Sequence, residues 1–249
     1  MASKLNYTVA PHLSEFTLPF PTFRTTRPDL TDYVGGALIF SRTARTKSNQ
    51  EGEEKTKEEN SDGSSASQPL RVLLLQRSYD DSWGGHWEGP GGSCDPEDAT
   101  LLDGVAREVL EETGLHVSRF VDLVAVDRWV RTRPDRVQVA AKFTFIVEVQ
   151  EARPAVSVKD TGSGEDGLPA DKLDDGRVVE GLERRWEERV TLDPAEHRAF
   201  EWVTEEDIRE GNLDGDEDED AVAKGKYKSF GQQGETILKA FRMLSEKVQ

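Results

Sequence analysis

Alternating hydrophobic and polar positions predict the main strands of this chain. The longest alternation runs over residues 136–150, where the apolar positions are Val137, Val139, Ala141, Phe143, Phe145, Val147 and Val149. Shorter segments with strand character cover 33–42, 70–76 and 200–203. A half-buried strand alternates in this way because successive side chains point to opposite faces of a sheet.

Two other segments have the spacing of a helix with one apolar face. Near the end of the chain these positions are Ile237, Phe241, Leu244 and Val248, and earlier they are Leu102, Val105, Ala106 and Val109. For the earlier helix, Asp98 is a suitable N-cap and Gly114 a suitable C′ residue. Thr204 and Asp207 can cap a brief third helix. Strands and helices interleave without a regular βα repeat, which favours an α+β fold over a parallel doubly wound sheet.

Three polar segments interrupt this pattern. We expect 44–69 to be disordered, because it cannot bury enough apolar surface to offset the entropy of ordering. We expect 154–185, which has five glycines and mixed charge, to form a long, loose loop. The third is an acidic loop at 211–224, within a stretch (205–220) that has ten acidic residues and one arginine. Its spacing is not that of a calcium-binding loop, since Glu219 and Gly225 stand where Gly and Glu are required.

Charge and cysteine content narrow the possible functions. The chain has 249 residues and a formal net charge of −17, which disfavours general binding to nucleic acid or to an anionic membrane surface. Cys94 is the only cysteine, so no intrachain disulfide forms and a reducing compartment is expected. There is no secretory signal and no apolar run of the ~20 residues that a membrane span requires. We expect a cytoplasmic protein, with a nuclear location not excluded.

Three carboxylates on the 102–114 helix stand out. Glu108, Glu111 and Glu112 lie at i, i+3 and i+4, where like charges repel, and in the half of the helix whose dipole disfavours anions. Such a cluster is a good site for a hard cation such as Mg²⁺, and Arg107 can hold a glutamate by a two-pronged hydrogen bond. The simpler interpretation is a solvated acidic face. The glycines of the turn before the helix favour the metal site, because they permit close backbone approach.

Residues 107–115, with the sequence R-E-V-L-E-E-T-G-L, resemble the second half of the Nudix box, G-x5-E-x7-R-E-U-x-E-E-x-G-U, at every fixed position. Gly92 supplies the leading glycine, and the preceding W-E-G-P-G-G turn is also similar to that of the family. Two departures occur: Asp98 replaces the first glutamate, and eight residues rather than seven separate it from Arg107. We expect the extra residue to alter the loop without changing the spacing of the carboxylates. The shorter Asp98 puts a supporting role for this position in question.

The resemblance implies a fold and an activity. The fold would be a mixed β-sheet between helices, formed by one domain at 31–249 after an N-terminal extension at 1–30. The activity would be metal-dependent hydrolysis of a diphosphate linkage in a nucleoside diphosphate joined to another group. The implied metal ligands for Mg²⁺ or Mn²⁺ are Glu108, Glu111, Glu112 and the carbonyl of Gly92. The segment beginning at Glu196 resembles one whose leading glutamate can reach the metal site.

The sequence also offers candidates for the general base and for contacts with the substrate. Glu111 is our first candidate for the general base and Glu196 the second, with Arg107 assisting catalysis. Arg128 and Arg131 belong to an arginine cluster in an expected hairpin and are candidates for phosphate contact, although a charged hairpin tip in water explains them as well. Trp87 can stack on a nucleobase, but packing in the core is the alternative. His86 is interpreted as a loop residue with a polar contact, and Cys94 is given no catalytic role.

Two other functions compete with hydrolysis. One is a non-catalytic Nudix-fold protein that binds a nucleotide or serves regulation; loss of box glutamates would favour it, but all three are present. The other is an acidic interaction protein acting through residues 214–220, which explains the charge but not the box. The expected partner is a small nucleoside diphosphate derivative, and a homodimer is possible. Nothing in the sequence identifies the second group on the diphosphate.

Overall fold

The computed structural model describes residues 6–42, 68–80, 82–132, 134–153, 185–211, 226–229 and 231–247. The expected loose segments 44–69 and 154–185 fall almost wholly outside these ranges. The acidic loop 211–224 does so too, apart from its first residue.

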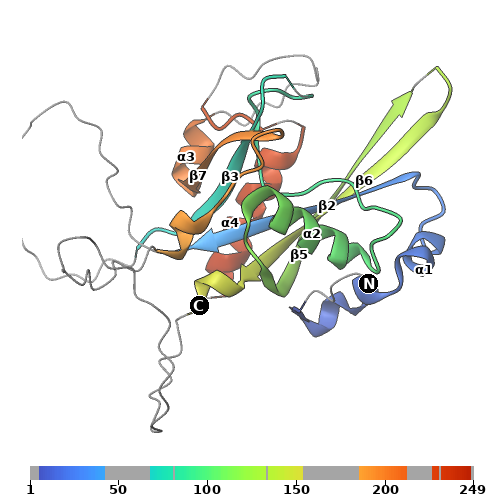
Figure 1. The fold of residues 1–249 in the computed structure, drawn as a ribbon, viewed down its shortest axis with the longest axis horizontal. Helices are drawn as coiled ribbons and strands as arrows, with labels where there is room; N and C mark the ends of the chain where they lie inside the picture. Colours follow the sequence, from blue (N-terminus) through green and yellow to red (C-terminus); the bar gives the residue numbers. More distant parts are fainter. Residues whose placement is uncertain are drawn as a thin grey trace, which may run out of the picture.

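A mixed β-sheet forms the centre of the molecule (Figure 1). Its strand order is β1 (Thr8–Val9), β5 (Val117–Thr132), β6 (Val137–Val149), β2 (Asp32–Ser41), β3 (Arg71–Arg77) and β4 (Trp87–Glu88), with β7 (His197–Thr204) also paired to β3. The β1–β5 and β2–β6 pairs are parallel and the other pairs antiparallel. This arrangement confirms the α+β class.

Helices cover both faces of the sheet. One face packs against α2 (Leu101–Thr113), α1 (Phe20–Thr25) and the 3-10 helix η1 (Pro11–Thr17), and the other against α3 (Glu205–Glu210) and α4 (Gln233–Glu246). Two further 3-10 turns are η2 (Gln150–Ala152) and η3 (Trp186–Arg189). Within the described ranges, no helix combines the length and the apolar character needed to cross a membrane.

The alternation along each strand divides the core into two layers. Leu73 and Leu75 of β3 join the layer on the α2 side, whereas Val72 and Leu74 join the layer on the α4 side, and all four are fully buried. A strand that is apolar at every position is expected where both faces of a sheet are covered. The two layers fix β3 between α2 and α4 and so hold the strands that carry the site.

Most expected elements are present, with ends shifted by a few residues. The caps of α2 differ from expectation at one end. Gly114 ends the helix with φ 69°, as predicted, but the predicted N-cap Asp98 is wrong. Thr100 is the cap, since its hydroxyl accepts a hydrogen bond from the Asp103 backbone N–H. At α3, both hydrogen bonds of the expected capping pair between Thr204 and Asp207 are formed.

The N-terminal segment contributes to the main core, which the sequence pattern did not predict. Leu13, Phe16, Phe20 and Phe23 are buried in the layer on the α2 side. The Phe16 ring meets Phe145 edge to face, with 5.1 Å between ring centroids. Residues 6–30 therefore pack as part of the layer that supports α2, and a domain boundary at residue 30 stays a prediction.

Candidate functional site

The turn that follows β4 is attached to the edge of β2. Backbone hydrogen bonds run from Ala37 N–H to the Pro90 carbonyl (2.8 Å) and from Gly35 N–H to the Gly92 carbonyl (2.9 Å). Gly91 has φ +151°, and a Cβ atom there would lie 2.2 Å from the Gly35 carbonyl oxygen. Only glycine fits this position, which explains how the turn can lie so close to the sheet.

Gly92 brings the same turn against α2. A Cβ atom at Gly92 would lie 2.8 Å from the carboxylate of Glu108, so the close approach expected from the glycines is present. The Gly92 carbonyl, an expected metal ligand, already accepts the hydrogen bond from Gly35. A carbonyl oxygen has two lone pairs, so this bond does not preclude a second contact.

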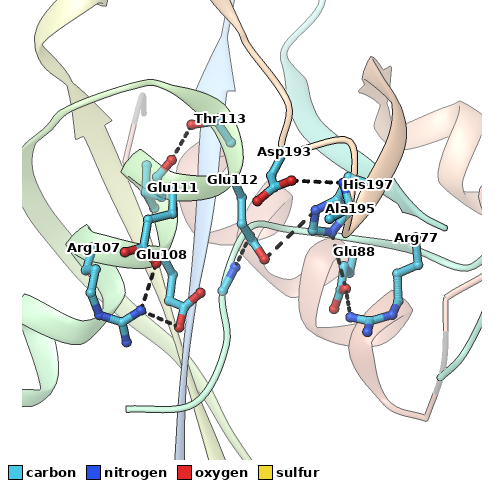
Figure 2. Close-up of polar contacts among 12 residues, drawn as sticks. Arg77, Glu88, Arg107, Glu108, Glu111, Glu112, Thr113, Asp193, Ala195 and His197 are labelled. Carbon is cyan, nitrogen blue, oxygen red and sulfur yellow. Dashed lines mark hydrogen bonds and ion pairs between the residues drawn. The ribbon is translucent and has the colours of Figure 1, made fainter. Parts of the chain in front are cut away.

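Arg107 organises the carboxylates at one side of the site, which we call the Arg107 side. Its Nη1 donates to Glu108 Oε1 and to Glu111 Oε2, both at 2.9 Å (Figure 2). Its Nε and Nη2 each donate to one oxygen of Asp98 at 3.2 Å. Burial opposes the charged guanidinium, but the Asp98 hydrogen bonds and the charge of Glu108 raise the pKa of Arg107. The shorter Asp98 therefore does fill a supporting role, because it holds Arg107 by both oxygens.

Glu112 lies in a different environment on the same helix. Its side chain is 5% exposed, and its Oε2 accepts a hydrogen bond from Gly91 N–H at 2.7 Å. Burial, together with the charges of Glu88 and Glu108, raises the pKa of Glu112 to about 9. Glu108 is affected in the same direction: burial raises its pKa, although Arg107 opposes the shift. The site thus carries more negative charge than its own cations balance.

The start of β7 completes this side of the site. Glu112, Glu196 and His197 each offer a ligand atom, and these three atoms lie within 4.8 Å of one another. The structure thus brings Glu196 to the box, as the resemblance implied. His197 was not singled out in the sequence, where its only signal is its position next to Glu196.

Glu88 is a second residue that sequence reasoning missed. It is 2% exposed, and its Oε1 accepts a hydrogen bond from Arg77 Nη1 at 2.6 Å. Lys142 Nζ and His197 Nε2 each lie 3.7 Å from a Glu88 oxygen. Burial opposes ionisation of Glu88, but its interactions with His197, Lys142 and Arg77 lower its pKa to about 2. Figure 2 shows His197 between Glu112 and Glu88; we call these three residues the His197 side.

The other expected site residues differ in their positions. Trp87 is 5% exposed and packs against Tyr227, which favours core packing, the alternative to stacking on a nucleobase. His86 is fully buried, and its Nδ1 lies 2.9 Å from the Trp83 carbonyl oxygen, which is the polar contact expected. Burial raises the pKa of Cys94 to about 12, in keeping with an unreactive thiol.

The two candidate phosphate-binding arginines lie on opposite faces of the β5–β6 hairpin. Arg128 pairs across the strands with Ala141 and Arg131 with Gln138. Alternation along β5 places Arg128 on the same face as Phe143, which belongs to the core layer next to α2. Arg131 is on the other face. The Arg128 guanidinium forms an ion pair with Asp29, and its side chain is 52% exposed.

A family comparison agrees with the geometry. The model of the NUDIX domain matches residues 62–165, a range that contains the glycine turn and the whole of α2. The matched range, which is less than half of the 249 residues, is identified as a NUDIX domain. The Nudix assignment made from the box is thereby confirmed, and with it the enzyme class, a Nudix-type hydrolase.

Solved structures of similar fold are numerous, whereas no curated protein matches the sequence. The NUDIX domain of Shewanella oneidensis NrtR in complex with ADP ribose has 14% identity, with 85% of this chain and 87% of that chain covered and a TM-score of 0.45. A MutT protein from Methanosarcina mazei has 19% identity, 86% and 95% coverage and a TM-score of 0.41. An Ap4A hydrolase from C. elegans has 14% identity, 87% and 99% coverage and a TM-score of 0.40. Likenesses this distant carry no information on substrate.

Proposed function

We propose that this protein hydrolyses a diphosphate linkage in a nucleoside diphosphate joined to another group, in a reaction that requires Mg²⁺ or Mn²⁺. The observation that carries the proposal is the meeting of carboxylates from two distant parts of the chain. Glu108 and Glu112 of α2 lie against the glycine turn, and Glu196, just before β7, lies near Glu112. Ordinary solvated glutamates have no reason to converge on a partly buried point.

The residues of this site suit a divalent cation. Carboxylate oxygens are the ligands that Mg²⁺ and Mn²⁺ prefer, and a cation would favour the ionised form of Glu112, which burial and the charges of Glu88 and Glu108 oppose. We assign Glu108, Glu111 and Glu112 as ligands, with the Gly92 carbonyl as a further one. When bound, such an ion clamps an anionic diphosphate, stabilises the departing phosphate and lowers the pKa of water.

The protein's own side chains would orient the reactants. Arg107 holds Glu108 and Glu111 in one arrangement, which limits the motion that these side chains must lose when the substrate binds. The side chain of Glu111 is 57% exposed and so can reach a water molecule beside the site. We retain Glu111 as the first candidate for the general base and Glu196 as the second.

Of the two hairpin arginines, Arg128 is the better candidate for phosphate contact. It lies on the sheet face that carries α2, whereas Arg131 lies on the opposite face. Its present partner Asp29 is itself exposed, and an exposed ion pair of this kind contributes little to stability. Exchange of Asp29 for a phosphate group would therefore cost little.

The test is metal-dependent hydrolysis across a panel of diphosphates, read by phosphate or mononucleotide release. The panel should include ADP-ribose, Ap4A, dinucleotide cofactors, coenzyme A, nucleoside triphosphates and diphosphoinositols. Glu111→Gln and Glu112→Gln should each abolish Mg²⁺-dependent release, because each removes an anionic oxygen from the site. The exposed α4 residue Glu235 provides the matched control, and Glu235→Gln should retain wild-type turnover.

Wild-type turnover in both Glu111→Gln and Glu112→Gln would refute this site. The competing function, a Nudix-fold protein that binds a nucleotide without turnover, predicts binding of a panel member with no release under any metal. A small nucleoside diphosphate derivative remains the proposed partner. A cytoplasmic location and a homodimer remain proposals as well.

A further inference from the structure

His197 is a buried side chain whose polar atoms have no hydrogen-bond partner. It is 1% exposed, and neither Nδ1 nor Nε2 forms a hydrogen bond. A buried polar group left in this condition costs about 1–3 kcal/mol, so native proteins usually satisfy it with a partner, a water molecule or an ion. The surroundings of each nitrogen indicate what that partner is.

The two nitrogens face different carboxylates. Nδ1 lies 4.0 Å from Glu112 Oε1, and an oxygen of Glu196 completes a group of three atoms within 4.8 Å of one another. Nε2 lies 3.7 Å from Glu88 Oε1. Both distances exceed those of a hydrogen bond. On the Nδ1 side, however, the 4.0 Å between Nδ1 and Glu112 Oε1 suits two atoms that share one ion, because ligand atoms about 2.1 Å from a metal lie up to about 4.2 Å apart.

We infer that Nδ1 of His197 is a direct ligand of a divalent cation that Glu112 and Glu196 also hold, while Nε2–H donates to Glu88. The inference deepens the proposed function and rests on it for the role of the ion in hydrolysis. It adds a nitrogen ligand to a site that the Nudix box alone would make from oxygen.

Glu88 has the properties that this arrangement requires. A histidine that binds a metal usually donates its other N–H to a carboxylate, which orients the ring. Glu88 is buried next to Nε2, and Arg77 and Lys142 lie beside its carboxylate. Glu88 ends β4, the strand that precedes the glycines, and so links that strand to the ligand on β7.

A charged imidazolium bridging Glu88 and Glu112 is the alternative arrangement. It would balance the two carboxylates, but it gives no reason for Glu196, an exposed side chain, to lie within reach of the same atoms. A shared cation accounts for all three groups. The two arrangements also differ in a measurable property, since only the cation site places nitrogen on a metal.

Pulsed electron paramagnetic resonance of Mn²⁺ bound to the full chain tests the inference directly. A coordinated imidazole produces a nitrogen modulation of the Mn²⁺ echo, and we expect it in the wild-type protein. His197→Gln should remove it. The matched control His116→Gln changes an exposed histidine, paired with Glu151, and should retain it. Wild-type protein with bound Mn²⁺ and no nitrogen modulation would overturn the inference, whatever the variants do.

Titration calorimetry with Co²⁺ and Mg²⁺ gives a second measurement. Imidazole favours Co²⁺ more than Mg²⁺, so His197→Gln should lower Co²⁺ affinity at least tenfold and Mg²⁺ affinity much less. Glu88→Gln should lower Co²⁺ affinity about 10–100-fold through loss of ring orientation, with the nitrogen modulation retained. Equal losses for both metals in His197→Gln would contradict direct ligation. Circular dichroism identifies any variant that fails to fold, and the wild-type spectrum then decides alone.

The outcome is separable from that of the proposed function. Nitrogen modulation without hydrolysis of any panel member would remove the proposed function and keep the metal ligand. Mg²⁺-dependent hydrolysis without nitrogen modulation would keep the proposed function and remove His197 as a metal ligand.

Discussion

The Arg107 side and the His197 side of this site both contain carboxylates, but these carboxylates differ in their partners and in their exposure to water. On the Arg107 side, one guanidinium is shared by Glu108, Glu111 and Asp98, and the Arg107 side chain is 24% exposed. On the His197 side, the three side chains are at most 5% exposed, and Glu112 has a backbone N–H as its hydrogen-bond donor. Among the carboxylates of α2, Glu108 and Glu111 thus share a guanidinium, whereas Glu112 has a backbone donor.

The difference shows where a cation is needed. The carboxylates on the Arg107 side already share a positive partner. A buried glutamate next to two other carboxylates is ionised only when it gains a positive partner, and otherwise binds a proton. We therefore propose that the Arg107 side supplies an ordered frame and that the His197 side supplies the affinity for a metal.

The largest expected effect is the loss of stability when Glu88 is removed. Glu88→Ala removes the buried carboxylate that Arg77 and Lys142 contact, and breaking buried ion pairs in this way costs about 3–5 kcal/mol. Asp98→Ala should cost only about 1 kcal/mol, because Arg107 keeps its other partners and is reached by water. Urea unfolding monitored by circular dichroism measures both values. Equal losses for the two variants would remove the distinction between the two sides.

The second effect is a pH dependence of opposite sign at the two buried glutamates. Folding lowers the pKa of Glu88 from 4.5 to about 2, so the stability it contributes is present above pH 4.5 and is lost as pH falls toward 2. Folding raises the pKa of Glu112 from 4.5 to about 9, so its contribution is present below pH 4.5 and is lost as pH rises toward 9. Glu88→Gln should flatten the acid limb and Glu112→Gln the alkaline limb.

Unfolding free energies measured across this pH range in a chelator would show both limbs. Addition of Mn²⁺ should flatten the alkaline limb of the wild-type protein, since the ion favours the ionised form of Glu112. An alkaline limb that is the same in wild type and Glu112→Gln would show that another group titrates there.

The smallest expected effect is that of replacing Arg107, which orders the carboxylates on its side of the site. Arg107→Lys keeps the charge but loses the planar fork that holds Glu108, Glu111 and Asp98 together. We expect turnover to fall about tenfold, which corresponds to ~1.4 kcal/mol in the barrier, while the free energy of unfolding changes by less than about 1 kcal/mol. Arg209 of α3 provides the control, since it forms a similar i,i+4 pair with Glu205 on the surface. A loss of turnover of the same size in Arg209→Lys would assign the effect to general electrostatics.

The sequence could predict only those site residues that lie close together along the chain. The carboxylates of α2 and the glycine turn lie within one short segment, so spacing alone indicates that they meet. Glu88 and His197 join the site only through the pairing of β3 with β4 and β7, and no local pattern encodes that pairing. The choice between stacking and core packing for Trp87 depends likewise on a distant residue, because its ring contacts Tyr227, far along the chain.

The family match is likewise limited to one continuous segment of the chain. It covers residues 62–165 and so omits β2, β7 and α4, although β2 lies between β6 and β3 in the sheet. Long polar segments separate these elements from the matched range. The packing of 6–30 was also not predicted, since its aromatic residues follow no single period and gain ring partners from β2, β5 and β6.

The antiparallel pair Ser41–Arg71 indicates where this chain can accommodate added sequence. The segment between β2 and β3 leaves and re-enters the sheet at adjacent residues, and Ser41 is also hydrogen-bonded to Glu187, close to where the chain returns after 154–184. Gly35, which holds the glycine turn, is six residues along β2 from Ser41, or about 20 Å at ~3.3 Å per residue. Lengthening the segment between the paired strands costs only loop entropy, about 0.6 kcal/mol per doubling. New sequence, with new recognition properties, can therefore be acquired at this end while hydrolysis at the other end is left as it was.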